Sequence, residues 1–404
     1  MDRISPQPWM SAPETRAVVE ALSAGGSEVR FVGGCLRDAL LEREVTDIDI
    51  ATPDPPARVI ELLTSAGLKA VPTGIEHGTV TAVAHHRPFE ITTLRHDVET
   101  YGRRAKVAFT DDWVADAARR DFTFNALSCT PDGRLYDPFG GRADLAEGRV
   151  RFVGRAEDRI REDVLRLLRF FRFYAHYGKP PPDEEALAAA HVMAPLLPKL
   201  SGERIAKELL KLLVAPDPAP VLILMRERAV LMHVLPEAKH FERLARLVAI
   251  EGEEGFGAEA PRRLAALLAG SETVGAMAGR LRLPNAMRDR MEQALLSPRP
   301  VPNMGAAKLR TLRYRLKAES FLDRALIAAA EGAALAPGWR EVFALATWQP
   351  PEFPLRGRDA LARGSKAGPD LGLLIEELEQ WWVAGDFRAD REACLAELER
   401  RLKG

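Results

Sequence analysis

The stretch that decides the fold is FVGGCLRDALLEREVTDIDIATPD, residues 31–54. Two glycines come shortly before Arg37 and Asp38, and a pair of aspartates, Asp47 and Asp49, stands on either side of one isoleucine. The pattern predicts a short strand that ends at the glycines, a helix that follows them, and a second strand that carries the aspartates. A flexible turn, an arginine and two close carboxylates in one short segment indicate a functional site.

Composition describes an ordinary globular protein. The 404 residues are 47% hydrophobic and 28% charged, which leaves room for about two to four domains. The formal net charge is −1, so any site for a polyanion must come from local clustering of arginine and lysine. Three widely spaced cysteines form no CxxC pair, which argues against a disulfide framework and against a zinc site. We find no apolar signal core and no membrane-spanning run, so we expect a soluble cytoplasmic protein with no membrane partner.

The chain changes character after about residue 155. Before that point helical segments alternate with short apolar runs, and residues 78–95 alternate like a hairpin with its turn near His86–Pro88. After it, blocks rich in leucine, alanine, glutamate and arginine have the length of helices. We therefore predict an α+β protein, in which an α/β head with a small mixed sheet precedes a long all-α region. Segments rich in proline or glycine separate the helical blocks at 178–185, 215–220, 296–305 and 348–358.

The paired aspartates suggest a metal site. In a strand, residues i and i+2 point to the same face, so Asp47 and Asp49 project together while Ile48 and Ile50 face the core. Two adjacent carboxylates repel each other, and a divalent cation such as Mg²⁺ would neutralise them. Glu90, on the polar face of its own predicted strand, is a candidate third carboxylate. Taken alone, the pair is more typical of an exposed, solvated strand.

The glycine turn adds an anion site to this picture. Gly33 and Gly34 lie where a strand passes into a helix, and backbone N–H groups at such a point favour anions. Arg37 can clamp a phosphate through two hydrogen bonds. The turn matches neither the GxxxxGK[ST] phosphate loop nor the GxGxxG dinucleotide fingerprint, and alone it is compatible with a simple helix-capping turn. Followed by the aspartate pair, it outlines a site for a triphosphate and a metal.

Five motifs in order make the pattern specific. Together they resemble the class II nucleotidyltransferases of the DNA polymerase β superfamily, and within it the bacterial CCA-adding tRNA nucleotidyltransferases, with poly(A) polymerases as a sister activity. The resemblance implies a catalytic head over residues 1–150, a helical neck with a base-recognition helix over 151–240, and a tRNA-binding helical body and tail over 241–404. The motifs are GGCLRD…DID (33–49), RRDFTFNAL (119–127), DPFGGRADLAEGRVRFVG (137–154), EDVLRLLRFFRF (162–173) and SGERIAKELLKLL (201–213).

The resemblance also implies roles for individual residues. Asp47 and Asp49 would hold the metal ions, and Glu90 is a lesser candidate that would support a metal or act as a base. The second motif would line the nucleotide pocket, although by itself it is equally compatible with a salt-bridged helix start. Nucleotide-binding residues implied in the first two motifs are Gly33, Gly34, Arg37, Arg120 and Asp121.

The fourth motif predicts an amphipathic helix from Ile160 to about Tyr177. Its apolar stripe is Ile160, Val164, Leu167, Leu168 and Phe171. Taken alone, its charged face is compatible with an exposed helix in which Glu162 pairs with Arg166. The charged face carries Glu162, Asp163, Arg166, Arg169 and Arg172.

A second interpretation of this face is base recognition. Asp163 can accept a hydrogen bond from an exocyclic amine and Arg166 can donate one, a polarity that suits cytosine and adenine but not uracil or guanine. The resemblance implies that the family reads CTP and ATP in this way. Glu162 would then hold Arg166 in place, and Arg169 and Arg172 would extend the contact toward the nucleotide and the primer end.

Within the family, the sequence favours complete CCA addition to the 3′ end and acceptor arm of tRNA, by two-metal nucleotidyl transfer that releases pyrophosphate. The basic patch that marks bacterial poly(A) polymerases after the aspartates is absent, and residues 95–113 fill the place of the flexible loop that CC-adding enzymes lack. An enzyme that adds only A, a poly(A) polymerase and a catalytically silent RNA-binding protein remain alternatives. The His96–Asp97 dipeptide does not indicate a phosphohydrolase, since the helical half offers no second HD pair.

Overall fold

A mixed sheet forms the centre of the N-terminal part. The computed structural model describes residues 3–101 and 104–403. Within them the sheet has the strand order β3-β4-β5-β2-β1-β8-β9, in which β2 and β5 run parallel and the other neighbours antiparallel. This confirms the predicted mixed sheet. The strands are β1 Arg30–Val32, β2 Asp49–Thr52, β3 Lys69–Gly74, β4 Thr79–Ala84, β5 Arg87–Thr93, β8 Ser128–Cys129 and β9 Leu135–Tyr136.

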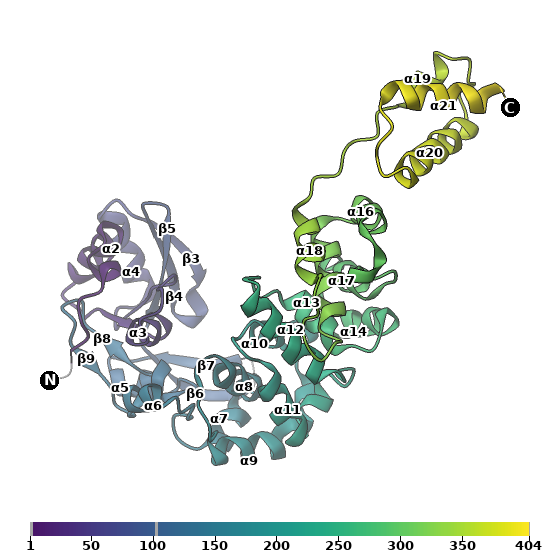
Figure 1. Ribbon diagram of the computed structural model, residues 1–404. Coiled ribbons are helices and arrows are strands. Elements are labelled where there is room, and N and C mark those ends of the chain that lie inside the picture. Colours follow the sequence, from purple (N-terminus) through teal and green to yellow (C-terminus); the bar gives the residue numbers. More distant parts are fainter. Residues whose placement is uncertain (1–2, 102–103, 404) are drawn as a thin grey trace. The chain divides into compact units, whose positions relative to one another are not determined.

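Two helices cover one face of this sheet, as Figure 1 shows for α2 (Pro13–Ser23) and α4 (Pro56–Ser65). Helix α3 (Gly34–Leu40) begins at the glycine pair, as predicted. A short helix, α1 (Pro8–Ser11), precedes α2. Apolar side chains of the helices and of the strands form one core, which fixes the strands that carry the site; it includes Val18, Leu22, Phe31, Leu36, Ile50, Val59, Leu63, Phe89 and Ile91.

The predicted alternation around the aspartates is confirmed. Ile48 and Ile50 are 2% and 0% exposed and belong to the core, whereas Asp47 is exposed and Asp49 is half-buried. Asp47 lies just before β2, which begins at Asp49. The predicted hairpin is β4–β5, and its turn lies at His85–His86, slightly earlier than expected, with positive φ at both residues.

The segment expected to be a flexible loop, 95–113, contains a second sheet instead. Strands β6 (Arg95–Tyr101) and β7 (Arg104–Phe109) pair antiparallel, and α5 (Trp113–Ala118) follows. Residues 102–103 of this segment lie outside the described residues. The expected loop is wrong, because the valine, threonine, tyrosine and phenylalanine residues of this segment favour strands in spite of its polar character and its glycine. The His96–Asp97 dipeptide therefore lies in a strand and not in a loop.

The predicted helix from Ile160 to Tyr177 is interrupted at Asp163. Helix α7 (Ala156–Glu162) ends there, Asp163 is extended with φ −148° and ψ 108°, and α8 (Leu165–Tyr177) follows. The Asp163 carboxylate accepts the backbone N–H of Leu165 at 3.1 Å, which offers the chain an alternative to a continuous helix. Asp163 and Arg166 are thus not successive positions on one helix face.

Helices make up the rest of the first compact unit, which ends at Pro236. Helix α8 packs on α10 and α7 packs on α9, and the predicted apolar stripe is buried except at Val164, which is half-buried. The division expected near residue 150 lies inside this unit, so the three-part division remains a prediction. The helices are α6 Gly141–Glu147, α9 Glu184–Met193, α10 Gly202–Leu213 and α11 Ala219–Glu227.

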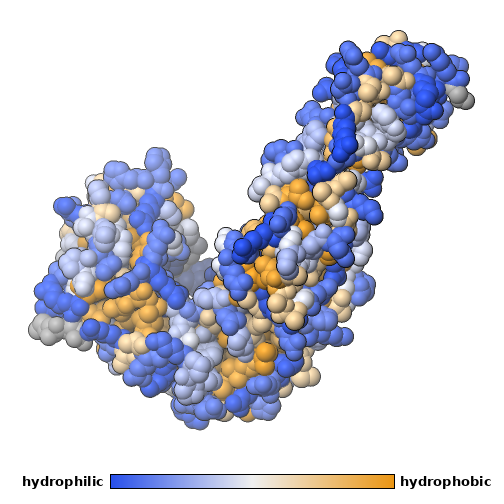
Figure 2. All heavy atoms as spheres, in the orientation of Figure 1, coloured by the Kyte–Doolittle hydropathy of each residue, from blue (hydrophilic) through white to orange (hydrophobic). Residues whose placement is uncertain are grey.

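The second unit begins at Glu237, and the regular elements among its described residues are all helices. Its core includes buried charges, since Arg262 bonds to Glu251 at 2.6 Å and to Asp323 at 2.7 Å. The visible face of the last three helices is mainly hydrophilic (Figure 2). Among the described residues, no helix has the length and apolar character needed to cross a bilayer. The helices are α12 Phe241–Glu253, α13 Ala260–Leu267, α14 Val274–Leu281, α15 Asn285–Leu295, α16 Ala306–Arg315, α17 Ala318–Ala329, α18 Trp339–Ala344, α19 Gly357–Leu361, α20 Pro369–Ala384 and α21 Arg391–Lys403.

Candidate active site

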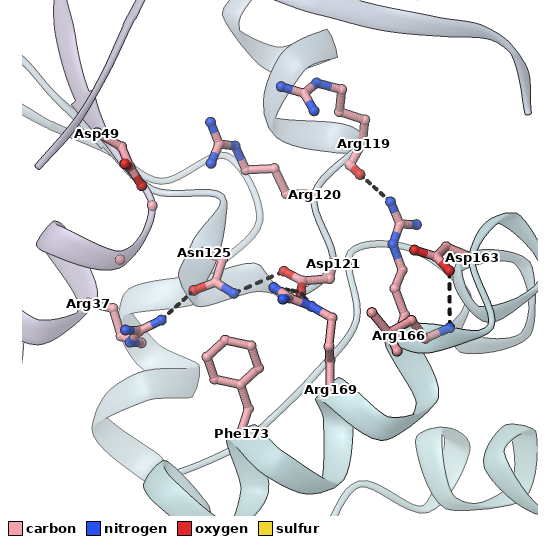
Figure 3. A pocket seen from close by; sticks show the side chains of 13 residues that line it. Arg37, Asp49, Arg119, Arg120, Asp121, Asn125, Asp163, Arg166, Arg169 and Phe173 are labelled. Carbon is pink, nitrogen blue, oxygen red and sulfur yellow. Dashed lines mark hydrogen bonds and ion pairs between the residues drawn. The ribbon is translucent and has the colours of Figure 1, made fainter. Parts of the chain in front are cut away.

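A pocket of about 380 Å³ in the first unit gathers most of the predicted site residues (Figure 3). It lies where the glycine turn and β2 meet the segment after α5 and the start of α8. Charged side chains dominate its wall. The predicted residues that line it are Gly33, Gly34, Arg37, Asp49, Arg120, Asp121, Asp163, Arg166 and Arg169, and the others are Arg119, Asn125, Leu165 and Phe173.

Acidic side chains lie close together on the side of the pocket that the sheet forms. Asp49 of β2 pairs in register with Glu90 of the parallel strand β5, so both carboxylates lie on the same face. Burial, the charge of Glu90 and the charge of Asp47 raise the pKa of Asp49 to about 6, although Arg120 opposes the rise. Withdrawal from water is the largest cause of this rise, and the neighbouring Glu90 carboxylate is the second.

The glycine turn lets the backbone approach this cluster closely. Gly33 has φ +71°, which glycine adopts without strain. A Cβ atom at this position would lie 3.2 Å from Nη1 of Arg120 and 3.6 Å from the Asp49 carboxylate. A larger residue would therefore crowd both charged groups.

Arg37 is held on several sides before any ligand binds. Asp38 accepts hydrogen bonds from its Nε at 3.0 Å and its Nη2 at 2.8 Å, and Asn125 accepts one from Nη1 at 3.1 Å. The guanidinium carbon lies 5.2 Å from the ring centre of Phe173 and 4.7 Å from that of Tyr177. A preorganised, delocalised cation of this kind suits phosphate recognition.

The segment after α5 supplies a buried carboxylate. Asp121 is 8% exposed and pairs with Arg169 through contacts of 2.6 Å to Nε and 2.5 Å to Nη2. Burial would raise the pKa of Asp121, but Arg169 and the Asn125 amide hold it below its usual value. Arg120 leans toward Asp49 and also pairs with Asp116 at 3.4 Å.

The corner between α7 and α8 fixes Arg166 and Asp163. Arg166 donates to Glu162 at 2.5 Å and to the backbone carbonyls of Arg119 at 2.9 Å and Arg159 at 3.3 Å. The predicted contact between Glu162 and Arg166 is therefore present. The second oxygen of Asp163 accepts a hydrogen bond from Arg204 of α10 at 2.7 Å.

Some predicted residues lie outside the pocket wall. Arg172, expected to extend toward the nucleotide, pairs with Glu208 of α10 at 2.5 Å, and the two side chains are 13% and 5% exposed. Arg172 lies six residues beyond Arg166 along α8, and this helical spacing turns its side chain toward α10. Asp47, Glu90 and Glu162 flank the pocket without lining it.

The sequence reasoning missed several residues that the structure brings to the site. Asn125 and Phe173 stand inside two of the recognised motifs but were assigned no role, and Arg119 was treated only as part of its motif. Arg204 lies in the fifth motif, far along the chain. The signal for Asn125 in the sequence is its place four residues after the predicted carboxylate Asp121 in one short motif.

Comparisons with known proteins find relatives over most of the chain. Residues 29–151 match the family described as Poly A polymerase head domain, and residues 182–242 match that described as probable RNA and SrmB-binding site of polymerase A. The mitochondrial CCA tRNA nucleotidyltransferase 1 of Mus musculus is 32% identical in an alignment that covers 95% of this chain and 89% of the relative. The CCA-adding enzyme of Streptococcus sanguinis is 42% identical over 205 residues, about half of each chain.

Solved structures show the same relationship. The Bacillus stearothermophilus CCA-adding enzyme in complex with CTP has a TM-score of 0.76 and 28% identity, and the match covers 98% of both chains. The Thermotoga maritima CCA-adding enzyme complexed with tRNA shares the fold, with a TM-score of 0.66 and 21% identity over the whole of both chains. The chain therefore belongs to the family of CCA-adding tRNA nucleotidyltransferases.

Proposed function

We propose that this protein adds CCA to the 3′ end of tRNA without a nucleic-acid template, using CTP and ATP and releasing pyrophosphate. One observation carries the proposal: a single pocket holds a fixed arginine, Arg37, an acceptor and donor pair, Asp163 and Arg166, and the acidic edge at Asp49. These features supply what the transfer needs, namely a phosphate clamp, a base reader and a metal-binding carboxylate. Membership of the family supports the same assignment.

We further propose that Mg²⁺ binds at Asp47 and Asp49, with Glu90 in support. Enzymes of this family generally need a divalent metal ion. The donors are all carboxylate oxygens. The raised pKa of Asp49 reflects its burial first and the charge of Glu90 second, and a bound hard cation would offset both. Among the described residues no three acidic, histidine or cysteine side chains form a ready-made cage, so phosphate oxygens of the substrate would complete the metal shell. When bound, the metal would lower the pKa of the tRNA 3′-hydroxyl and neutralise charge on the departing pyrophosphate.

The protein side chains bind and orient the reactants. Arg37 holds the triphosphate, and Asp121 and Arg169 form the pocket wall beside it. Asp163 accepts a hydrogen bond from the amino group of cytosine or adenine, and Arg166 donates to the adjacent ring nitrogen. In the proposed reaction the 3′-hydroxyl attacks the α-phosphorus in line, so catalysis would rest mainly on positioning and charge neutralisation.

The partners follow from this assignment. We propose that tRNA binds through its acceptor arm and 3′ end. The helical regions over 151–240 and 241–404 would contact the sugar-phosphate backbone and recognise the shape of the tRNA. A structure of the Thermotoga maritima relative contains tRNA, and structures of related enzymes contain CTP or ATP. A cytoplasmic location is part of the proposal and is testable by cell fractionation.

An incorporation assay tests the function. tRNA that ends before CCA and tRNA that ends in CC each receive CTP, ATP or both, with Mg²⁺, and Asp47→Ala and Asp49→Ala serve as blanks. We expect three additions ending in A on the first substrate and one A on the second. A single A on the second with no use of CTP would identify an A-adding enzyme, and long A tails a poly(A) polymerase. Binding of tRNA with no incorporation would leave an RNA-binding protein.

A further inference from the structure

Asn125 connects two arginines on different walls of the pocket. Its Oδ1 accepts a hydrogen bond from Nη1 of Arg37 at 3.1 Å, and its Nδ2 donates to Oδ1 of Asp121 at 2.9 Å. Asp121 in turn binds Arg169 through its other oxygen. The result is one continuous chain of contacts from α3 to α8, which Figure 3 shows running from Arg37 through Asn125 and Asp121 to Arg169.

The chemistry of this position calls for an amide. Toward Arg37 the side chain must accept a hydrogen bond, and toward Asp121 it must donate one. Aspartate would accept from Arg37 but would place a second carboxylate against Asp121, and leucine of similar size would satisfy neither partner. Asn125 is 7% exposed, so water does not readily replace a lost contact.

Asn125 completes the restraint of Arg37. Asp38 already binds Nε and Nη2 of that guanidinium, which leaves Nη1 to Asn125. Asp121 is likewise fixed, since its Oδ1 also accepts the backbone N–H of Phe122 at 2.9 Å. The amide therefore bridges two groups that are each anchored by a second contact, and it sets the distance between them.

We propose that Asn125 is a positioning residue that fixes Arg37 relative to the Asp121–Arg169 pair, so that the triphosphate of either nucleotide meets a preformed site. This inference rests on the proposed function, in which Arg37 holds the triphosphate. The chain of contacts does not include Asp163 or Arg166, so it acts on binding of the triphosphate and leaves the choice of base unchanged.

The same short turn contains a matched control. Thr123 and Asn125 both lie in the 3-10 turn Thr123–Asn125 and both are buried. The Thr123 hydroxyl, however, donates to Asp144 at 2.6 Å and does not line the pocket. Thr123→Val thus removes a buried hydrogen bond from the same turn without touching Arg37, and it reports the purely structural cost.

The test compares Asn125→Leu and the milder Asn125→Ser with Thr123→Val and the unchanged protein. For each we would measure KM for CTP, ATP and tRNA, inhibition by pyrophosphate, equilibrium binding of CTP and pyrophosphate, and the melting temperature. We expect Asn125→Leu to raise KM for both nucleotides about tenfold, the size of one lost charged hydrogen bond, and to weaken pyrophosphate inhibition in parallel. KM for tRNA and rejection of UTP and GTP should not change.

A charge exchange sharpens the test. Asn125→Asp should weaken nucleotide binding more than Asn125→Leu, because the new carboxylate faces Asp121 and further neutralises Arg37. Adding Asp121→Asn to Asn125→Asp restores a donor opposite the acceptor, so the double variant should bind pyrophosphate better than Asn125→Asp alone.

Two results would overturn the inference. One is unchanged KM for nucleotides and unchanged pyrophosphate binding in both Asn125→Leu and Asn125→Ser. The other is a fall in kcat and melting temperature alone, matched by Thr123→Val. Equilibrium binding needs no turnover, so it separates the two proposals. An unchanged protein that binds CTP without incorporating it would count against the proposed function. Weaker CTP binding by the Asn125 variants would still support the positioning role.

Discussion

Asp49 and Glu90 lie at the same register position of two parallel, hydrogen-bonded strands, β2 and β5. Parallel pairing sends both side chains to the same face, where Asp49 is partly shielded from water. Burial of Asp49 is the largest cause of its raised pKa and the charge of Glu90 is the second. The sheet thus holds two acids together at a cost in stability, and this relationship makes the site sensitive to single substitutions.

Replacing Asp49 with asparagine should stabilise the fold while it abolishes incorporation. The pKa of Asp49 is about 6 in the folded chain and 3.8 ordinarily, so the folded state binds this proton more tightly than the unfolded state. The stability contribution of this group therefore falls as pH rises from about 4 to 6, and the cost is fully present above that range. Urea unfolding at pH 8 with a chelator should show Asp49→Asn more stable by about 1–3 kcal/mol. Asp47→Asn, at an exposed position, should change stability less, and a destabilised Asp49→Asn would contradict the argument.

Glu90→Gln should let the enzyme work at lower pH. Removing the negative charge of Glu90 lowers the pKa of Asp49, so the ionised form of Asp49 persists further into acid. The measurement is the rate of nucleotide incorporation between pH 5 and pH 8 at constant Mg²⁺. The acid limb of the profile should move to lower pH relative to the unchanged enzyme. Glu20→Gln, on the exposed side of α2, should leave the limb in place, and an unmoved limb in Glu90→Gln would refute the coupling.

Glu162→Gln should weaken discrimination among bases. Among the described residues, Glu162 is the only carboxylate that binds Arg166. Its loss leaves Arg166 held by two backbone carbonyls. We expect incorporation of UTP or GTP relative to CTP to rise by about tenfold, the effect of one weakened charged contact. Single-nucleotide assays on tRNA lacking CCA measure this ratio. Glu157→Gln, which alters an exposed pair with Arg161 on the same helix, should not change it.

Breaking the pair between Arg172 and Glu208 should destabilise the protein. The two side chains join α8 to α10 and are almost fully buried, so Glu208→Ala leaves an uncompensated buried cation. We expect a loss of about 3–5 kcal/mol in the free energy of unfolding, measured with urea. The double variant Arg172→Met/Glu208→Leu should recover most of it and keep the KM for CTP. A raised KM in that double variant with normal stability would instead restore Arg172 to the nucleotide site.

Local patterns predicted a large part of the fold and of the site. The alternation around Asp47 and Asp49 followed from strand periodicity, and the glycine turn, β4–β5 and the apolar stripe of α8 followed from equally local rules. Periodicity also placed Glu90 on a polar face. That Glu90 lies beside Asp49 depends on which strands pair, and the sequence pattern alone does not settle strand order.

The remaining features depend on contacts between distant segments. The break at Asp163 follows from a capping bond to Leu165 that competes with the helix, whereas a helical pattern predicts continuity. Asn125 acquires its role only where Arg37 and Asp121 come together. Arg172 shares the spacing of Arg166 and Arg169, and only the position of α10 separates its role from theirs.

The hydrogen bonds that hold Arg166 affect which substitutions this protein tolerates. Two of its three partners are main-chain carbonyl oxygens, of Arg119 and Arg159, which every amino acid supplies. Substitution of either side chain therefore preserves these hydrogen bonds to Arg166, provided that the local backbone conformation does not change. In the proposed function Arg166 reads the nucleobase, so base selectivity depends partly on the backbone path, which most substitutions of the surrounding side chains leave unchanged.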